Sequence, residues 1–215
     1  MSMRYAIPEG GRLKLLSGSG SVHVIAEARD DVEIDQPRAH VEVRDDHVLE
    51  VRSKSGSVTA RCPTGARVSV GVISGSVRLE GEFGSVKVSA ISGSIHVDQV
   101  QGDVDIRSVS GSLTLESCGG NCSMNTKSGR ITVGEVGKGL QAATISGTIE
   151  GATAGQGAVE VKSISGSVSL QVPEGRHPHA KFKTLSGRVR CDCPAGEDFD
   201  LKVTTLSGSI EITKA

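Results

Sequence analysis

The chain of 215 residues has very few aromatic residues, with no Trp, one Tyr and three Phe. Its hydrophobic core must therefore be built from Val, Ile, Leu and Ala. No stretch of about 18 or more apolar residues occurs, which excludes a membrane-spanning helix. The first residues also lack the apolar run of a signal peptide, so the sequence as given predicts a cytoplasmic protein, or an exported one if a leader has been removed.

An excess of charge of one sign is also missing. The formal net charge is −1, and basic and acidic residues are interspersed along the chain. Such a balance does not give the basic footprint of a nucleic-acid-binding domain. We therefore expect no nucleic-acid partner and no direct membrane insertion.

The motifs of cofactor and metal chemistry are absent as well. There is no P-loop, no Gly-x-Ser-x-Gly elbow and no Cys-x-x-Cys pair, so we expect neither a cofactor nor a metal. The cysteines stand mostly where equivalent segments have Val or Leu, which favours a role as small core residues. They are Cys62, Cys118, Cys122, Cys191 and Cys193. A disulfide or metal site that joins Cys118 and Cys122 across one turn remains an alternative.

Glycine is plentiful, with 28 residues, and most of the chain repeats one short phrase, apolar-Ser-Gly-x-apolar. The spacing of its glycines is mainly 18 residues and lengthens to 19 and 21 in some steps. We expect these glycines to be structural turn residues; they are Gly56, Gly75, Gly93, Gly111, Gly129, Gly147, Gly166, Gly187 and Gly208. A second turn signal lies midway between them and becomes Pro-x-Gly in several of the longer steps.

Apolar residues alternate with polar ones on both sides of each turn, as in Val86-Lys-Val88 and Ile95-His-Val97. This period of two predicts strands that are buried on one face. The residue before Ser-Gly is usually apolar too, as in Ile91, and we group it with the inward positions. An antiparallel meander would need about twenty strands in one open sheet, which exceeds the usual size. The repeat therefore favours an all-β fold, a single-stranded parallel β-helix of residues 1–215 with coils of about 18–21 residues and two turn edges. We expect right-handed coiling from the general crossover preference.

The combination of Pro-x-Gly and Ser-Gly turns resembles the bacterial Toastrack, or putative adhesin, family. The residues that carry the resemblance are Ile7-Pro8-Glu9-Gly10, Val172-Pro173-Glu174-Gly175 and Thr184-Leu185-Ser186-Gly187-Arg188-Val189. The resemblance covers nearly the whole chain and is least regular over residues 26–46. It implies a parallel β-helix with a suggested role in envelope-stress signalling or surface adhesion, and no established catalytic residues.

Three carboxylates recur at one place in consecutive units, because Glu80, Asp98 and Glu116 each stand five positions after a repeat glycine. If the coils stack in register, these side chains line up on one outer face about 4.8 Å apart, with Arg78 and His96 beside them. Carboxylates placed this closely can hold a cation or share acid and base roles. They are the candidate catalytic residues, and a solvated acidic strand face is the alternative.

Three functions follow from these observations. The first is a non-enzymatic scaffold of adhesin-like or envelope-stress type, which binds a protein or surface partner through its strand faces or its variable Pro-x-Gly edge. The second is a self-assembling β-helix, a homo-oligomer joined through the unpaired strands of its end coils, with residues 26–46 as a possible N-terminal cap. The third is a carbohydrate-active enzyme that uses Glu80, Asp98 and Glu116.

Overall fold

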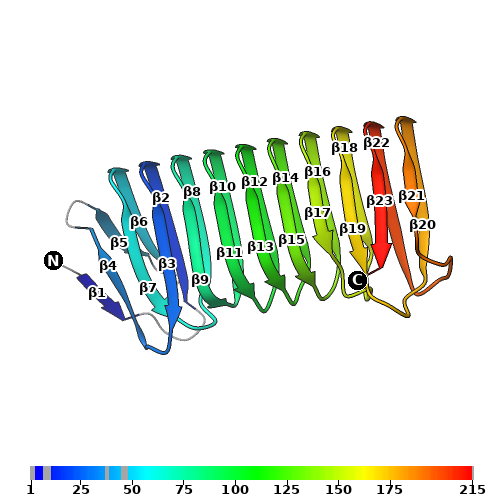
Figure 1. Ribbon diagram of the computed structural model, residues 1–215. Coiled ribbons are helices and arrows are strands. Elements are labelled where there is room, and N and C mark those ends of the chain that lie inside the picture. The colour runs from blue at the N-terminus through cyan, green and yellow to red at the C-terminus, as the bar shows by residue number, and fades with distance from the viewer. Residues whose placement is uncertain (1–2, 7–10, 37–38, 45–47, 215) are drawn as a thin grey trace.

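Two β-sheets lie face to face along an elongated molecule (Figure 1). The structure is a computed structural model that describes residues 3–6, 11–36, 39–44 and 48–214. Within these residues the chain forms 12 strands in one sheet, sheet A, and 11 in the other, sheet B. From β6 onward it alternates between the two sheets, so that each of these coils contributes one strand to each sheet. The predicted all-β solenoid is confirmed.

The spatial order of the strands differs from their order in the sequence at both ends. Sheet A runs β1 (Met3–Ala6), β4 (Asp31–Asp35), β7 (Val58–Pro63), β3 (Val22–Glu27), β9 (Val77–Phe83), β11 (Ile95–Val100), β13 (Leu113–Cys118), β15 (Ile131–Val136), β17 (Ile149–Ala152), β19 (Val168–Val172), β23 (Ile210–Lys214) and β21 (Val189–Cys191). Sheet B runs β20 (Pro178–Ser186), β22 (Phe199–Ser207), β18 (Val159–Ser165), β16 (Leu140–Ser146), β14 (Cys122–Ser128), β12 (Val104–Ser110), β10 (Ser85–Ser92), β8 (Arg67–Ser74), β2 (Arg12–Ser19), β6 (Val48–Ser55) and β5 (His40–Arg44).

Neighbouring coils pair in parallel and in register, so that equivalent residues form columns. In sheet B, for example, Val86 lies beside Val104 and Val104 beside Cys122. The inward columns from both sheets merge into one continuous core of mainly Val, Ile and Leu. Each such side chain contributes about 1.5 to 3 kcal/mol when it is removed from water. The stacked core therefore accounts for a fold that has almost no aromatic residues.

The predicted turn glycines form a column along one edge of the solenoid, which we call the Ser-Gly edge. Gly93 has a φ of 130°, a region that residues with a Cβ rarely adopt. A Cβ at this position would lie 1.9 Å from the carbonyl oxygen of Gly75 in the neighbouring coil. The amide of Gly93 instead donates to the carbonyl of Ser110 in the next coil at 3.2 Å. Glycine is thus required both by the turn and by the close stacking of the turns.

The longer repeats coincide with places where the chain skips a coil. After β7 the chain passes over the coil of β2 and β3, because β8 pairs with β2 and not with β6. After β19 it passes the position of β22 to form β20, and it then returns, so that the red β22 lies inside the orange β20 in Figure 1. A skip spans about 9.6 Å, twice the strand spacing, which the longer Pro-x-Gly segments provide. The Pro-x-Gly at 8–10 lies outside the described residues.

The two ends of the solenoid are built differently. At the N-terminal end, β4 and β5 of the irregular segment 26–46 pair antiparallel with β7 and β6, and β1 pairs antiparallel with β4. At the C-terminal end, β20 and β21 each have one strand neighbour within the described residues. The predicted cap segment therefore continues both sheets in the antiparallel sense; its Asp45 and Asp46 lie outside the described residues.

The prediction that the residue before Ser-Gly points inward was wrong. Ile91 is 52% exposed and Leu185 is 81% exposed. The pleat explains the error, because Val86, Val88 and Ala90 of β10 face the core and place Ile91 on the opposite, outer face.

The cysteines all carry free thiols. Cys62, Cys118 and Cys122 are buried in the core, while Cys191 and Cys193 at the C-terminal end are half-buried. Burial raises the pKa of Cys62 to about 12, so this thiol is neutral at physiological pH. These positions agree with a role as core residues.

Candidate functional site

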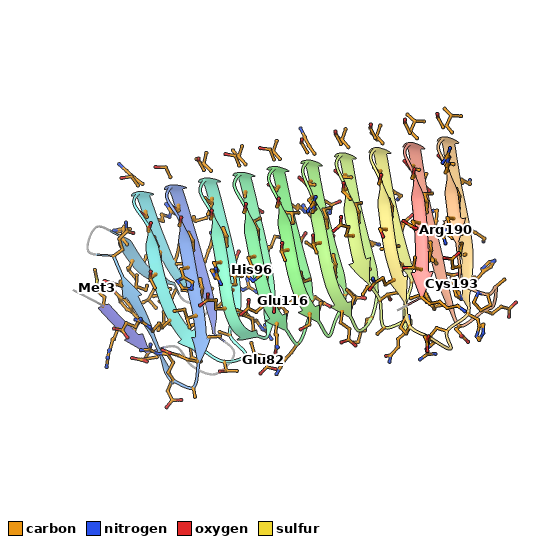
Figure 2. All side chains as sticks on the ribbon, in the orientation of Figure 1. Met3, Glu82, His96, Glu116, Arg190 and Cys193 are labelled. Carbon is orange, nitrogen blue, oxygen red and sulfur yellow. The ribbon has the colours of Figure 1, made fainter. Side chains whose placement is uncertain are left out.

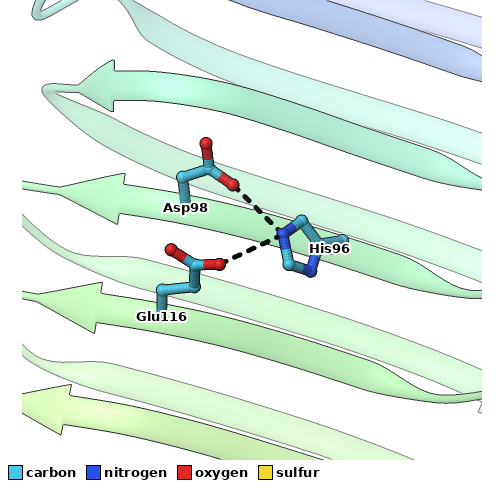
Figure 3. A group of neighbouring side chains, drawn as sticks. All are labelled: His96, Asp98 and Glu116. Atoms are coloured by element: carbon cyan, nitrogen blue, oxygen red, sulfur yellow. Dashed lines mark ion pairs between the residues drawn. The ribbon is translucent and has the colours of Figure 1, made fainter.

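The predicted carboxylates lie on three neighbouring strands of sheet A, with Glu80 on β9, Asp98 on β11 and Glu116 on β13. His96 of β11 lies between two of them (Figure 3). Its Nε2 is 3.1 Å from Asp98 Oδ1 and 3.5 Å from Glu116 Oε1. The amide of Gly81 donates to Asp98 Oδ2 at 3.0 Å, which orients this carboxylate. The ligand atoms of His96, Asp98 and Glu116 lie within 4.8 Å of one another, so the group can share a proton or hold a cation.

The third carboxylate, Glu80, has different partners. His23 Nε2 of β3 lies 2.9 Å from Glu80 Oε2, and the Arg78 guanidinium pairs with Glu80 Oε1. The hydrogen bond from His23 and then that from Arg78 lower the pKa of Glu80 below its usual range. The carboxylate column is thus divided into two groups, each of which has a histidine within hydrogen-bonding distance. Sequence reasoning placed Arg78 and His96 beside the carboxylates but did not find His23, which comes from a distant segment.

These carboxylates lie on an open strand face. The side chains of Glu80, Asp98 and Glu116 are 34%, 26% and 56% exposed. Figure 2 shows His96 and Glu116 on the side of the ribbon that faces the viewer. Carboxylates that lie on an open face beside basic partners are typical of solvated ion pairs. The acid and base of a glycosidase lie instead in an enclosed site.

A second surface was missed from the sequence: a row of exposed apolar side chains on the outer face of sheet B. Each one stands immediately before Ser-Gly, and neighbouring coils place them about 4.8 Å apart. We call this set the apolar row; in spatial order it comprises Ile73, Ile91, Val109, Ile145, Ile164, Leu206 and Leu185. Lys127 of β14 interrupts it between Val109 and Ile145.

The apolar row follows the Ser-Gly edge from β8 to β20, a distance of about 34 Å at the strand spacing. Side chains project beyond the tight turns along the upper edge in Figure 2. Single exposed apolar residues are ordinary on protein surfaces, whereas a continuous row marks a surface for interaction. The alternation within each strand was sufficient to predict it, because residues beside the inward columns must face outward.

Near β2 the apolar row opens into a shallow hollow of about 710 Å³. Its lining includes Leu16, Gly71, Ile73 and Ile91, with Arg52 on the same wall. The hollow exists because Gly71 has no side chain on the outer face. It is the part of the surface best shaped to receive an apolar group.

These features define a parallel β-solenoid with stacked glycine turns, one acidic open face and one apolar row. The family profile of Toastrack (DUF4097) matches residues 6–150 and, in an overlapping second match, residues 82–215. The chain therefore belongs to the Toastrack family, as the turn pattern indicated.

Solved structures show the same fold. The putative adhesin from Bacteroides fragilis NCTC 9343 aligns with 13% identity and a TM-score of 0.57, over 100% of this chain and 96% of its own. The putative adhesin from Parabacteroides distasonis ATCC 8503 aligns with 12% identity and a TM-score of 0.50, over 98% and 96% of the two chains. Among curated proteins, none matches the chain. The described part of the chain holds no helix long and apolar enough to cross a bilayer.

Proposed function

We propose that the protein is a non-enzymatic interaction scaffold of adhesin-like type, and that the apolar row on sheet B is its docking surface. The observation that carries this proposal is the exposure of seven apolar side chains in one row, from 41% at Val109 to 81% at Leu185. A solenoid presents such a row rigidly, since every member is fixed by the register of its coil. The names of the structural neighbours agree with a binding role.

The carbohydrate-active alternative has less support. Glu80 is paired with His23 and Arg78, while Asp98 and Glu116 share His96. A glycosidase needs one carboxyl group kept protonated beside an ionised one, whereas the hydrogen bonds from His23 and Arg78 lower the pKa of Glu80. The open face also gives no enclosure for a sugar.

Self-assembly through the end coils is also disfavoured by the composition of the ends. The outer strand β20 of sheet B carries Lys181 and Lys183, and the outer strand β21 of sheet A has only three residues. Edge lysines and short edge strands are devices that prevent pairing between molecules. At the other end, β4 and β5 turn both sheets antiparallel. We therefore place the partner on the apolar row and not at the ends.

Site-specific photo-crosslinking tests the proposal. A photoreactive amino acid is placed at Ile91 or Ile145, and at Glu135 or Gln171 on the outer face of sheet A as matched exposed controls, in cells that produce the protein. We expect discrete adducts from the two row positions and none from the controls. Absence of adducts at the row, or the same adducts from all four positions, would contradict the proposal.

A further inference from the structure

The net charge of −1 conceals a separation of charge between the two faces. The outer face of sheet B is predominantly basic. Its outward lysines and arginines are Arg12, Lys14, Arg52, Lys54, Arg67, Lys87, Arg107, Lys127, Lys162, Lys181, Lys183 and Lys202. The described outward carboxylates on the same strands are fewer: Glu42, Glu50, Asp105, Glu160 and Asp200.

The outer face of sheet A has the opposite balance. Its outward carboxylates are Glu27, Asp31, Glu33, Asp35, Glu80, Glu82, Asp98, Glu116, Glu135, Glu150 and Glu211. The described lysines and arginines on its strands are Arg4, Arg61, Arg78, Arg190 and Lys214. Because the chain crosses from one sheet to the other in every coil, charges that are interspersed along the sequence become segregated in space.

Several cations on sheet B lack a carboxylate partner. Arg12 and Arg67 are neighbours in register on β2 and β8, are both exposed, and form no ion pair within the described residues. With Lys14 and Lys87 they line a groove of about 960 Å³, in which Lys14 pairs with Glu50 and Lys87 with Asp105. Asp103 also lines this groove, and Arg12 and Arg67 are its unpaired cations among the described residues. Two adjacent guanidinium groups repel each other, and a bound anion relieves this repulsion.

We propose that the outer face of sheet B binds the surface of an anionic lipid bilayer, with the apolar row at the boundary between headgroups and acyl chains and the lysines and arginines over the headgroups. This interfacial contact departs from the expectation, drawn from the sequence, of no direct membrane insertion. This inference rests on the proposed docking role of the apolar row and names its partner. Basic and apolar residues on one surface are the combination found in interfacial membrane binding. The hollow lined by Leu16, Gly71 and Ile73, with Arg52 and Lys54 beside it, fits an acyl chain below an anionic headgroup.

The apolar row distinguishes a bilayer from other polyanions. Nucleic acids and acidic polysaccharides would use the cations but offer no apolar phase for Ile91, Ile145 and Ile164. Lys127 within the row is compatible with insertion, because a lysine keeps its amine at the headgroup level while its stem lies among apolar groups. The acidic face of sheet A would then point away from the bilayer.

Vesicle co-sedimentation tests the inference with the full chain. The probes are vesicles of phosphatidylcholine alone and of an equimolar mixture with phosphatidylglycerol, at low and at high salt. We expect binding to the anionic vesicles only, weakened by salt. Ile91→Ser/Ile145→Ser/Ile164→Ser should weaken binding at least tenfold.

Charge variants supply the matched control. Each basic residue near an anionic surface contributes about fivefold, so Arg12→Gln/Arg67→Gln should weaken binding on the order of 25-fold. Arg78→Gln/Arg190→Gln removes the same charge from sheet A and should change binding less than twofold. Circular dichroism of each variant establishes that it is folded.

Three results would overturn the lipid inference: no binding to anionic vesicles, equal weakening by both charge variants, or binding unaffected by the three serines. The lipid inference would also fail if an oligonucleotide bound equally tightly and its binding were unchanged by the three serine substitutions. The basic face would then be a binding surface for a polyanion. If row-specific protein adducts are obtained by photo-crosslinking while the vesicles fail to bind, the docking surface stands and the lipid partner does not. If both fail, the proposed function fails as well.

Discussion

The Ser-Gly turns and the Pro-x-Gly turns of the solenoid use glycine for different reasons. At the Ser-Gly edge a Cβ on Gly111 would lie 2.0 Å from the Gly93 carbonyl oxygen of the next coil. In the Pro-x-Gly turns of the opposite edge, Gly65 and Gly175 both have a φ of 77°, and a Cβ on either would meet nothing within 4 Å. The Ser-Gly turns are constrained by their neighbours, and the turns at Gly65 and Gly175 only by their own backbone. Other turns of the opposite edge are stacked as well, since a Cβ on Gly102 would lie 2.4 Å from the Gly84 carbonyl oxygen. The Ser-Gly edge therefore holds the apolar row at a fixed spacing.

The largest predicted effect breaks the stacked edge. Gly111→Ala places a methyl group against the backbone of Gly93 and strains a φ of 135°. We expect a loss on the order of 3 kcal/mol or more in the free energy of unfolding, measured by urea denaturation.

Gly65→Ala is the matched substitution at the other edge. It strains the turn but meets no neighbour, so its cost should be roughly 1 to 2 kcal/mol. Equal losses for the two variants would show that stacking does not constrain the Ser-Gly edge.

Much of the fold could be predicted from the sequence, but the order of the coils at the two ends could not. The turn glycines, the parallel coils and the neighbouring carboxylates follow from periodicity alone. The displaced order of β6 and β20 does not follow from periodicity, because inward columns of Val, Ile and Leu fit beside one another in any order. The longer Pro-x-Gly steps were the one sequence feature that indicated it. The partner of Glu80, His23, was hidden by the same displacement.

Two surface features were missed from the sequence: the apolar row, although strand alternation was sufficient to predict it, and the charge separation, which needs the strands to be assigned to sheets. Ile91 was grouped with the core because it is apolar, although its parity relative to Val88 places it outside. The opposite charges of the two faces are invisible in a net charge of −1. They become clear only when residues of consecutive strands, such as Arg67 of β8 and Glu80 of β9, are assigned to opposite sheets.

A smaller effect concerns Glu80 on the acidic face. Its pKa is lowered in the folded protein, so its ion pairs stabilise the fold above the unfolded pKa of about 4.3 and cease to do so as pH falls through the folded value. Because the side chain is 34% exposed, we expect Glu80→Gln to cost about 0.5 kcal/mol or less at pH 7.

As the pH falls through the folded pKa of Glu80, the free energies of unfolding of the wild type and of Glu80→Gln should converge. A difference that stays constant between neutral and acid pH would contradict the role given to His23 and Arg78.

The smallest expected change in stability tests the central claim, that the residues before Ser-Gly form an outer docking row and not part of the core. The measurement is the free energy of unfolding of Ile91→Ser/Ile145→Ser/Ile164→Ser by urea denaturation. Surface positions predict a change within about 0.5 kcal/mol per residue. A loss on the order of 2 to 5 kcal/mol per residue, as for apolar side chains removed from a core, would contradict the account.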